Sequence, residues 1–253
     1  MDPRSNTGQG GTVMLQPDEL SFKDPTTLTK WTKGLLYAQI VLCVIAIVSD
    51  VMEHMLLAEL QSGLSEDARA GIMERATASD TRQQIIGIAQ FALFVVVAIF
   101  ILRWIYRANQ NARALGATAM RFTHGWAILW YFIPIANLWK PYQAMKEIWK
   151  ASADPHDPGA AETSRLLPWW WFLWILSNIV GQVLFRVGLA AKEVDALIGA
   201  NLLMVVSDGL DIVLDLVLLA IIDRIWRMQM SRFANRPTSG EPQTQPAPGA
   251  SSV

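Results

Sequence analysis

The sequence predicts an all-α, polytopic integral membrane protein, a bundle with four transmembrane helices and one broken re-entrant or interfacial helix. Of its 253 residues, 52% are hydrophobic and only 17% are charged, which is unusual for a surface that faces water. The hydrophobic residues are also gathered into blocks, and blocks of about 18 residues or more are typical of membrane spans. The blocks cover residues 34–48, 85–102, 125–139, 169–185 and 197–222.

Both ends of the chain are predicted to be flexible tails. Residues 1–28 and 233–253 are rich in Gly, Pro, Ser, Thr and Gln and have few large hydrophobic side chains. Neither segment can bury enough surface to offset its chain entropy, so the membrane domain is predicted to comprise residues 29–232. No small-x-small cleavage site follows the first hydrophobic block, which is therefore expected to remain as a span.

The first two spans are predicted at about residues 31–57 and 83–106, and the charges around them set their orientation. The loop between them, residues 59–82, carries five acids against three arginines. The segment that follows the second span has no acid and four arginines: Arg103, Arg107, Arg113 and Arg121. Because cytoplasmic loops are rich in Lys and Arg, that segment and the amino terminus are placed in the cytoplasm.

The last two spans are predicted at about residues 168–189 and 196–222. A stretch with four arginines follows the last one, so the carboxyl terminus is also placed in the cytoplasm. Tryptophan prefers the membrane interface, and six tryptophans lie at the ends assigned to the cytoplasm. These are Trp31, Trp104, Trp169, Trp170, Trp171 and Trp226.

The remaining block, residues 125–139, cannot cross the membrane if both termini are on the same side. Its roughly 15 residues would form a helix of about 22 Å, shorter than the hydrocarbon core of about 30 Å. Pro134 and Pro141 interrupt it, so we predict a re-entrant or interfacial helix broken around Pro134 to Asn137. The following residues, from Leu138 to Lys150, have the pattern of an interfacial amphipathic helix.

The segment from Trp104 to Ser152 is similar to the bacterial membrane-protein family called domain of unknown function 4328. The resemblance rests on these residues: Arg107, Asn109, Asn111, Leu115, Gly116, Gly125, Trp126, Ala127, Trp130, Phe132, Pro134, Asn137, Leu138, Pro141, Tyr142, Met145, Glu147, Trp149, Ala151 and Ser152, with Gln229 farther on. It implies a multi-pass protein of the bacterial inner membrane, and it implies no biochemical role.

Three acids in the last predicted span are the strongest local anomaly. Asp208, Asp211 and Asp215 are spaced by three and four residues, so they share one helical face. Counted from the start of the span, Asp208 lies roughly 18 Å deep. An ionised carboxylate there costs at least about 3 kcal/mol unless it is paired, hydrated or protonated. The acids indicate either a proton or cation site or neutral groups that serve helix packing.

Partners for these acids can be sorted by depth in the membrane. Asn178 and Gln182 match Asp208 and Asp211 in depth, and Asn137 in the broken segment could line the same polar site. Two ion pairs are also candidates by depth: Arg186 with Asp50 or Glu53, and Arg103 with Asp215. A separate cytoplasmic set, suited to anionic lipid headgroups or to setting topology alone, comprises Arg107, Arg113, Arg121, Lys146 and Lys150.

Catalytic, cofactor and metal motifs are not found in the sequence. It has no Gly-x-Ser-x-Gly, no P-loop and no Rossmann glycine run, and its three histidines show no ligand spacing. We therefore predict no enzyme, cofactor, metal or nucleic-acid partner, and expect membrane lipids and a second copy or another membrane protein as partners. Two functions remain open: a non-enzymatic scaffold or accessory protein that binds lipid, and a small transporter or channel.

Overall fold

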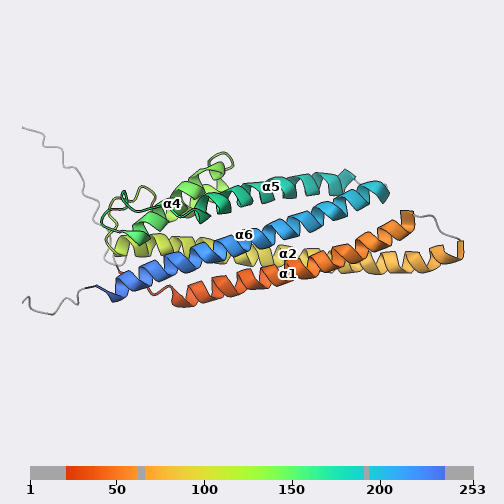
Figure 1. Ribbon diagram of the computed structural model, residues 1–253, viewed down its shortest axis with the longest axis horizontal. Coiled ribbons are helices and arrows are strands. Elements are labelled where there is room, and N and C mark those ends of the chain that lie inside the picture. The colour runs from red at the N-terminus through yellow and green to blue at the C-terminus, as the bar shows by residue number, and fades with distance from the viewer. Residues whose placement is uncertain (1–20, 62–65, 191–193, 237–253) are drawn as a thin grey trace, which may run out of the picture.

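The computed structural model describes residues 21–61, 66–190 and 194–236, and within these ranges the only regular elements are helices. Four long helices run beside one another (Figure 1): α1 Thr26–Gln61, α2 Glu66–Ala114, α5 Leu166–Ala190 and α6 Val194–Ala234. Shorter helices lie between α2 and α5 in the chain: α3 His124–Leu129, η2 Trp130–Phe132, η3 Ala136–Leu138 and α4 Lys140–Ala153.

The helix packing differs between the two ends of the bundle. Along the bundle α6 packs against α1 and α5, and α1 also packs against α2. At one end, α3 and α4 pack against α2, and α4 also packs against α5 and α6 (Figure 1). The helix α4 therefore links α2 to α5 at this end. The start of α1 and the end of α6 lie at the same end, which the charge pattern assigns to the cytoplasm.

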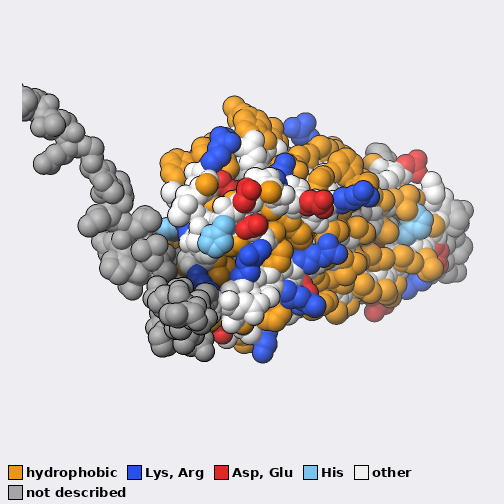
Figure 2. All heavy atoms as spheres, turned by 60° about the vertical axis from the view of Figure 1, so that its left-hand side comes forward, with side chains coloured by type: hydrophobic (Ala, Val, Ile, Leu, Met, Phe, Trp, Pro, Cys, Tyr) orange, Lys and Arg blue, Asp and Glu red, His pale blue; other side chains and the backbone are white. Residues whose placement is uncertain are grey.

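Three of the helices are long and apolar enough to cross a membrane: α1, residues 71–114 of α2, and α5. Their hydrophobic side chains largely face outward, as they do for Val41 on α1, Phe91 on α2 and Phe185 on α5. In the view of Figure 2, hydrophobic side chains form a wide band over the flank of the bundle. Such a surface fits lipid and not water. The helix α6 is not among the three, so a fourth crossing stays a prediction.

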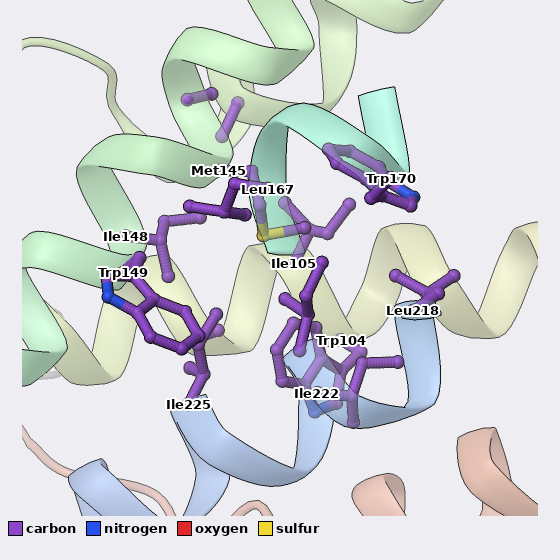
Figure 3. Packing of buried hydrophobic residues seen from close by; sticks show 14 of the residues in the cluster. Trp104, Ile105, Met145, Ile148, Trp149, Leu167, Trp170, Leu218, Ile222 and Ile225 are labelled. Atoms are coloured by element: carbon purple, nitrogen blue, oxygen red, sulfur yellow. The ribbon is translucent and has the colours of Figure 1, made fainter. Parts of the chain in front are cut away.

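A hydrophobic cluster fills the end of the bundle that holds α4 (Figure 3). Residues from four helices meet there: Trp104 and Ile105 of α2, Met145, Ile148 and Trp149 of α4, Leu167 and Trp170 of α5, and Leu218, Ile222 and Ile225 of α6. The apolar face of α4 is thus buried against protein, with Ile148 fully inaccessible. Contacts with α2, α5 and α6 thus account for the hydrophobic pattern of α4, and its position at the membrane surface stays a prediction.

Two other boundaries differ from the sequence prediction or refine it. The expected loop over residues 59–82 is helical from Glu66 onward, since its alanines and charged residues are good helix formers and no proline interrupts them. The helical pattern breaks between Phe132 and Ala136, close to the predicted position at Pro134 to Asn137. Whether this segment enters the membrane stays a prediction.

The helix α2 ends in a turn that aims the chain into α3. Gly116 has a φ of 109°, and its N–H bonds to the carbonyl of Arg113 while that of Ala117 bonds to the carbonyl of Ala112. This is the Schellman arrangement, in which a left-handed glycine ends a helix. The next helix, α3, begins where the side chain of Thr123 accepts a hydrogen bond from the N–H of Trp126.

Candidate functional site

A cavity of about 430 Å³ lies among α1, α2, α5 and α6, in the half of the bundle away from the hydrophobic cluster. Three carboxyl groups line it, those of Asp50, Asp208 and Asp211. The other polar lining residues are Gln39, Cys43, Gln83, Gln90 and Ser207. The cavity therefore gathers acids from α1 and α6 beside amides from α1 and α2.

Neutral side chains hold the three acids. Gln90 Nε2 donates to Asp208 Oδ1 at 2.8 Å, and Gln83 Nε2 donates to Asp50 Oδ1 at 2.8 Å. The two glutamines are seven residues apart, so two turns of α2 present both amides on one face. On the other side, the Ser177 hydroxyl of α5 donates to Asp211 Oδ1 at 2.5 Å. Neutral donors from α2 and α5 thus orient the acids of α1 and α6 without neutralising them.

The charge of the cavity follows from this choice of partners. Among the residues that the structure describes, no Lys or Arg lines the cavity. The nearest arginine in sequence to the glutamine pair, Arg82, instead donates to the Ser49 side chain at 2.7 Å. An acid-lined cavity with low-dielectric walls attracts cations and takes up protons. Within the described ranges, no group of three or more His, Cys, Asp or Glu side chains is placed to hold a metal ion.

Asp215 continues the acidic face toward the hydrophobic cluster. It is only 4% exposed, and its Oδ2 atom has no hydrogen-bond partner in the described part of the chain. An ionised carboxylate in that position would carry a large desolvation cost, whereas a protonated carboxyl avoids most of it. Asp215 does not line the cavity. On the acidic face of α6, the carboxyls of Asp208 and Asp211 therefore border the cavity, whereas that of Asp215 is buried.

Asn137, Asn178 and Gln182 do not join the acids. They line a separate groove on the outside of α5, together with Arg186. The prediction that they share a site with Asp208 and Asp211 rested on depth in the membrane. In the structure, Asn178 and Gln182 lie on the face of α5 that borders this groove. Ser177, one residue before Asn178, is the α5 side chain that reaches the cavity region.

The two ion pairs expected from depth are not formed. Arg186 and Arg103 are both exposed on the outer surfaces of their helices, and neither has an ion pair with an acid of the described residues. Asp50 is held by Gln83, and Asp215 is buried without a base. This corrects the predicted pairing of Arg186 with Asp50 or Glu53 and of Arg103 with Asp215, because equal depth does not bring two side chains to the same face.

The residues expected at lipid headgroups are placed in different ways. Arg113 is committed to the protein, since it donates to the carbonyls of Met120 and Phe122 at 3.0 Å each. Lys150 reaches the carbonyl of Gly159 at 3.3 Å. The side chain of Arg121 is exposed, while those of Arg107 and Lys146 are half-buried. Headgroup contacts by this set stay a prediction.

Residues that carry the family resemblance meet in a clasp at the end of the bundle that holds α4. We use the term clasp for Asn109, Asn111, Glu147, Ser152 and Gln229. Gln229 donates to the Ala108 carbonyl at 2.8 Å and to the Ser152 hydroxyl at 2.9 Å. Glu147 accepts from the N–H groups of Arg121 and Phe122, and Asn111 bonds both backbone groups of Lys23. These contacts tie loops to helices, so the residues have a structural role.

The residues that sequence reasoning missed are the glutamines and Ser177. Their signal was present in the spacing: Gln83 and Gln90 are seven residues apart in a predicted span, as are Asn201, Asp208 and Asp215 in another. A seven-residue repeat of polar groups marks one seam of a packed helix. The repeat alone does not tell which helix faces the acids, so amides of the fourth predicted span were expected beside them in place of those of the second.

Comparison with known proteins identifies a family. No curated protein and no solved structure matches the chain. The family model described as domain of unknown function (DUF4328) matches residues 67–227, which run from the start of α2 into the last turns of α6. The match includes Gln83 and Gln90 of α2 and the three aspartates of the acidic face, Asp208, Asp211 and Asp215. The chain therefore belongs to the DUF4328 family.

Proposed function

We propose that this protein moves protons or a small monovalent cation across a membrane, with the acid-lined cavity as the binding site. The observation that carries the proposal is the cavity itself, because it touches Asp208 and Asp211 in the middle of the bundle. A scaffold needs no acid-lined space at that depth, and charged groups there are retained at a cost of several kcal/mol. The Gln90 amide and the Ser177 hydroxyl orient these two acids without neutralising them, so both acids can bind a cation.

The proposal takes α6 as a fourth crossing and places both termini in the cytoplasm. With that orientation, which rests on the arginine distribution, the cavity lies in the outer half of the membrane. Leu36, Trp104 and Leu218 of the hydrophobic cluster then separate it from the cytoplasm. A cation bound at Asp208 therefore needs a movement of α6 against α1 and α2 to continue inward, as in alternating access.

A non-enzymatic scaffold of the bacterial inner membrane is the second candidate function. The observation that favours it is the clasp, which fixes loops and helix ends at the end that holds α4 through buried hydrogen bonds. A rigid end of this kind would present a constant surface to a partner protein. The two candidates differ in what they require of the acids, because a scaffold needs neither Asp208 nor Asp211 to be ionisable.

Flux through purified protein in liposomes tests the proposal. We would impose a membrane potential with a potassium gradient and valinomycin, and follow internal pH with a trapped dye. The wild-type protein is expected to acidify or alkalinise the lumen faster than empty liposomes, and Asp208→Asn with Asp211→Asn is expected to abolish the difference. To test a monovalent cation, the assay is repeated with a sodium gradient, and sodium uptake is measured in place of internal pH.

The matched control is Asp195→Asn, which neutralises an exposed acid at the start of the same helix. It should leave flux unchanged, because Asp195 lies outside the cavity and accepts a hydrogen bond from Gln61. If the wild-type protein gives no more proton or sodium flux than empty liposomes, the transport proposal is rejected and the scaffold function is favoured.

A further inference from the structure

A groove of about 390 Å³ runs along the outer face of α5 beside η3. Its walls are mainly hydrophobic, with Leu138 from η3 and Ile175 and Ile179 from α5. Polar side chains occupy one stripe of it, where Gln182 and Arg186 follow Asn178 at intervals of four residues. The groove thus combines a long apolar wall with a charged outer end.

The polar stripe faces away from the rest of the protein. Asn178, Gln182 and Arg186 are all exposed, although they lie in a helix that is long and apolar enough to span a membrane. Asn178 is satisfied within α5, since its Nδ2 donates to the Trp174 carbonyl at 2.7 Å. Arg186 has no ion pair among the described residues. An amide on the lipid-facing side of a span and a guanidinium at its end favour a polar ligand, because exposing either group to lipid tails is costly.

The depths of these groups match the layers of a lipid molecule. Arg186 lies 18 residues beyond Pro168, or about 27 Å along the helix, which places it at the opposite interface of a core about 30 Å thick. Gln182 lies one turn deeper, at the level where ester groups follow a phosphate. Ile179, Ile175 and Leu138 continue inward as a hydrophobic wall.

We propose that this groove binds one glycerophospholipid, with its phosphate on Arg186, its ester region at Gln182 and an acyl chain along Ile179 and Ile175 to Leu138. A guanidinium is well suited to phosphate, because it offers paired donors in a fixed plane. The inner end of the groove is held in place, since Trp171 Nε1 donates to the Leu138 carbonyl at 3.0 Å. A preformed groove loses little freedom when the lipid enters it.

A second copy of the chain is the competing occupant, and charge argues against it. A two-fold axis through the stripe would bring the two Arg186 guanidiniums toward each other at the membrane interface, where the dielectric constant is lower than in water. Like charges repel strongly there, whereas a lipid phosphate neutralises each arginine. The lipid site is independent of the proposed transport function, because it shares no residue with the acid-lined cavity.

Native mass spectrometry of the full-length protein with added phosphatidylglycerol tests the site. The wild type is expected to retain one lipid after extensive detergent washing. Arg186→Gln should weaken the apparent affinity about tenfold, equivalent to about 1.4 kcal/mol, whereas Arg186→Lys keeps the charge and should lose less. Ile179→Trp fills the groove and should displace the lipid with Arg186 intact.

The control is Arg75→Gln, which removes an exposed arginine elsewhere on the protein. It should retain the lipid as the wild type does, and gel filtration confirms that each variant is folded. A wild type that retains no lipid, or equal retention in Arg186→Gln, Ile179→Trp and wild type, would overturn the proposal. A dimer that Ile179→Trp converts to monomer would assign the groove to a second copy instead.

Discussion

At the scale of single residues, the acids that line the cavity are held by amides of α2 and a hydroxyl of α5. An arginine was expected beside Asp50, and the amides of Asn178 and Gln182 were expected beside Asp208 and Asp211. Asp208 and Asp50 each accept from a glutamine of α2, and Asp211 accepts from Ser177. A hydrogen bond from a neutral donor orients a carboxylate and leaves its charge in place. The acids are conspicuous in the sequence because aspartate is rare in membrane spans. Their partners are not, because depth along a helix does not tell which face of a neighbouring helix lies beside them.

Gln90→Ala should destabilise the protein, because it leaves the Asp208 carboxyl without its amide donor. The expected loss is about 1–3 kcal/mol, the cost of a buried polar group that loses its partner. Thermal unfolding in detergent measures it. Gln84→Ala removes an exposed glutamine of the same helix and should change the free energy of unfolding by less than about 0.5 kcal/mol. An equal effect of both substitutions would contradict the hydrogen bond to Asp208.

The Lys33–Asp223 pair should make stability depend on pH. A hydrogen bond from Lys33 at 2.7 Å, with the charges of Lys33 and Arg227, lowers the pKa of Asp223 below its usual value. A lowered pKa stabilises the folded state above the unfolded pKa of about 3.9, and this contribution is lost as the pH falls through the folded pKa.

Asp223→Asn is therefore expected to lower the free energy of unfolding at pH 7, by up to about 1 kcal/mol for this partly exposed pair. The difference from wild type should shrink as the pH is lowered below about 4. Chemical denaturation at several pH values measures it, with the exposed Asp80→Asn as the control. A difference that stays constant from pH 7 to pH 3 would rule out the ion pair as its cause.

At the scale of helices, the sequence predicted where hydrophobic segments lie better than where helices end. Four hydrophobic blocks became the long helices, and the break near Pro134 lies close to its predicted place. The extension of α2 back to Glu66 was missed, because residues 66–82 are polar and polarity was taken as loop. Helix propensity and membrane hydropathy are separate properties, and a polar helix can continue a membrane span into water.

Gly116→Ala tests the turn that ends α2. A side chain at a φ of 109° is strained, and its Cβ would lie 3.2 Å from the His156 ring. The strain alone is expected to cost about 1–2 kcal/mol, measured as a lower unfolding temperature. Gly34→Ala is the matched control, since a Cβ there meets no atom within 4 Å and α1 is helical. It should be neutral or slightly stabilising, and a loss as large as that of Gly116→Ala would contradict the account of the turn.

At the scale of the whole molecule, the bundle is closed by a hydrophobic cluster at one end and hollowed by an acid-lined cavity toward the other. The sequence predicted the membrane bundle because exposed apolar surface leaves a strong compositional trace. It did not predict which helices would be neighbours, so Asn178 and Gln182 were assigned to the acids when they face a separate groove. Helix depth follows from the chain, but helix rotation depends on contacts with other helices.

Cysteine labelling tests the orientation of the whole bundle. Single cysteines replace exposed residues at Glu74, Thr118 and Asn235 in a Cys43→Ser background. An impermeant thiol reagent on intact cells should label Glu74→Cys, and the same reagent on inverted vesicles should label Thr118→Cys and Asn235→Cys. Labelling of Asn235→Cys from outside the cell would mean an odd number of crossings, and the fourth span or the non-crossing segment would be wrong.

Water access to the acid-lined cavity is the most direct test of the account. Ser207→Cys, in a Cys43→Ser background, places a thiol of similar size on the cavity wall, and Ile99→Cys places one on the exposed hydrophobic surface of α2. We expect a small cationic thiol reagent to modify Ser207→Cys in intact cells, faster than an anionic reagent of the same size, because the acids attract the cation. Ile99→Cys should react with neither. If Ser207→Cys is as unreactive as Ile99→Cys, the cavity is dry, and the acids serve helix packing in place of ion transport.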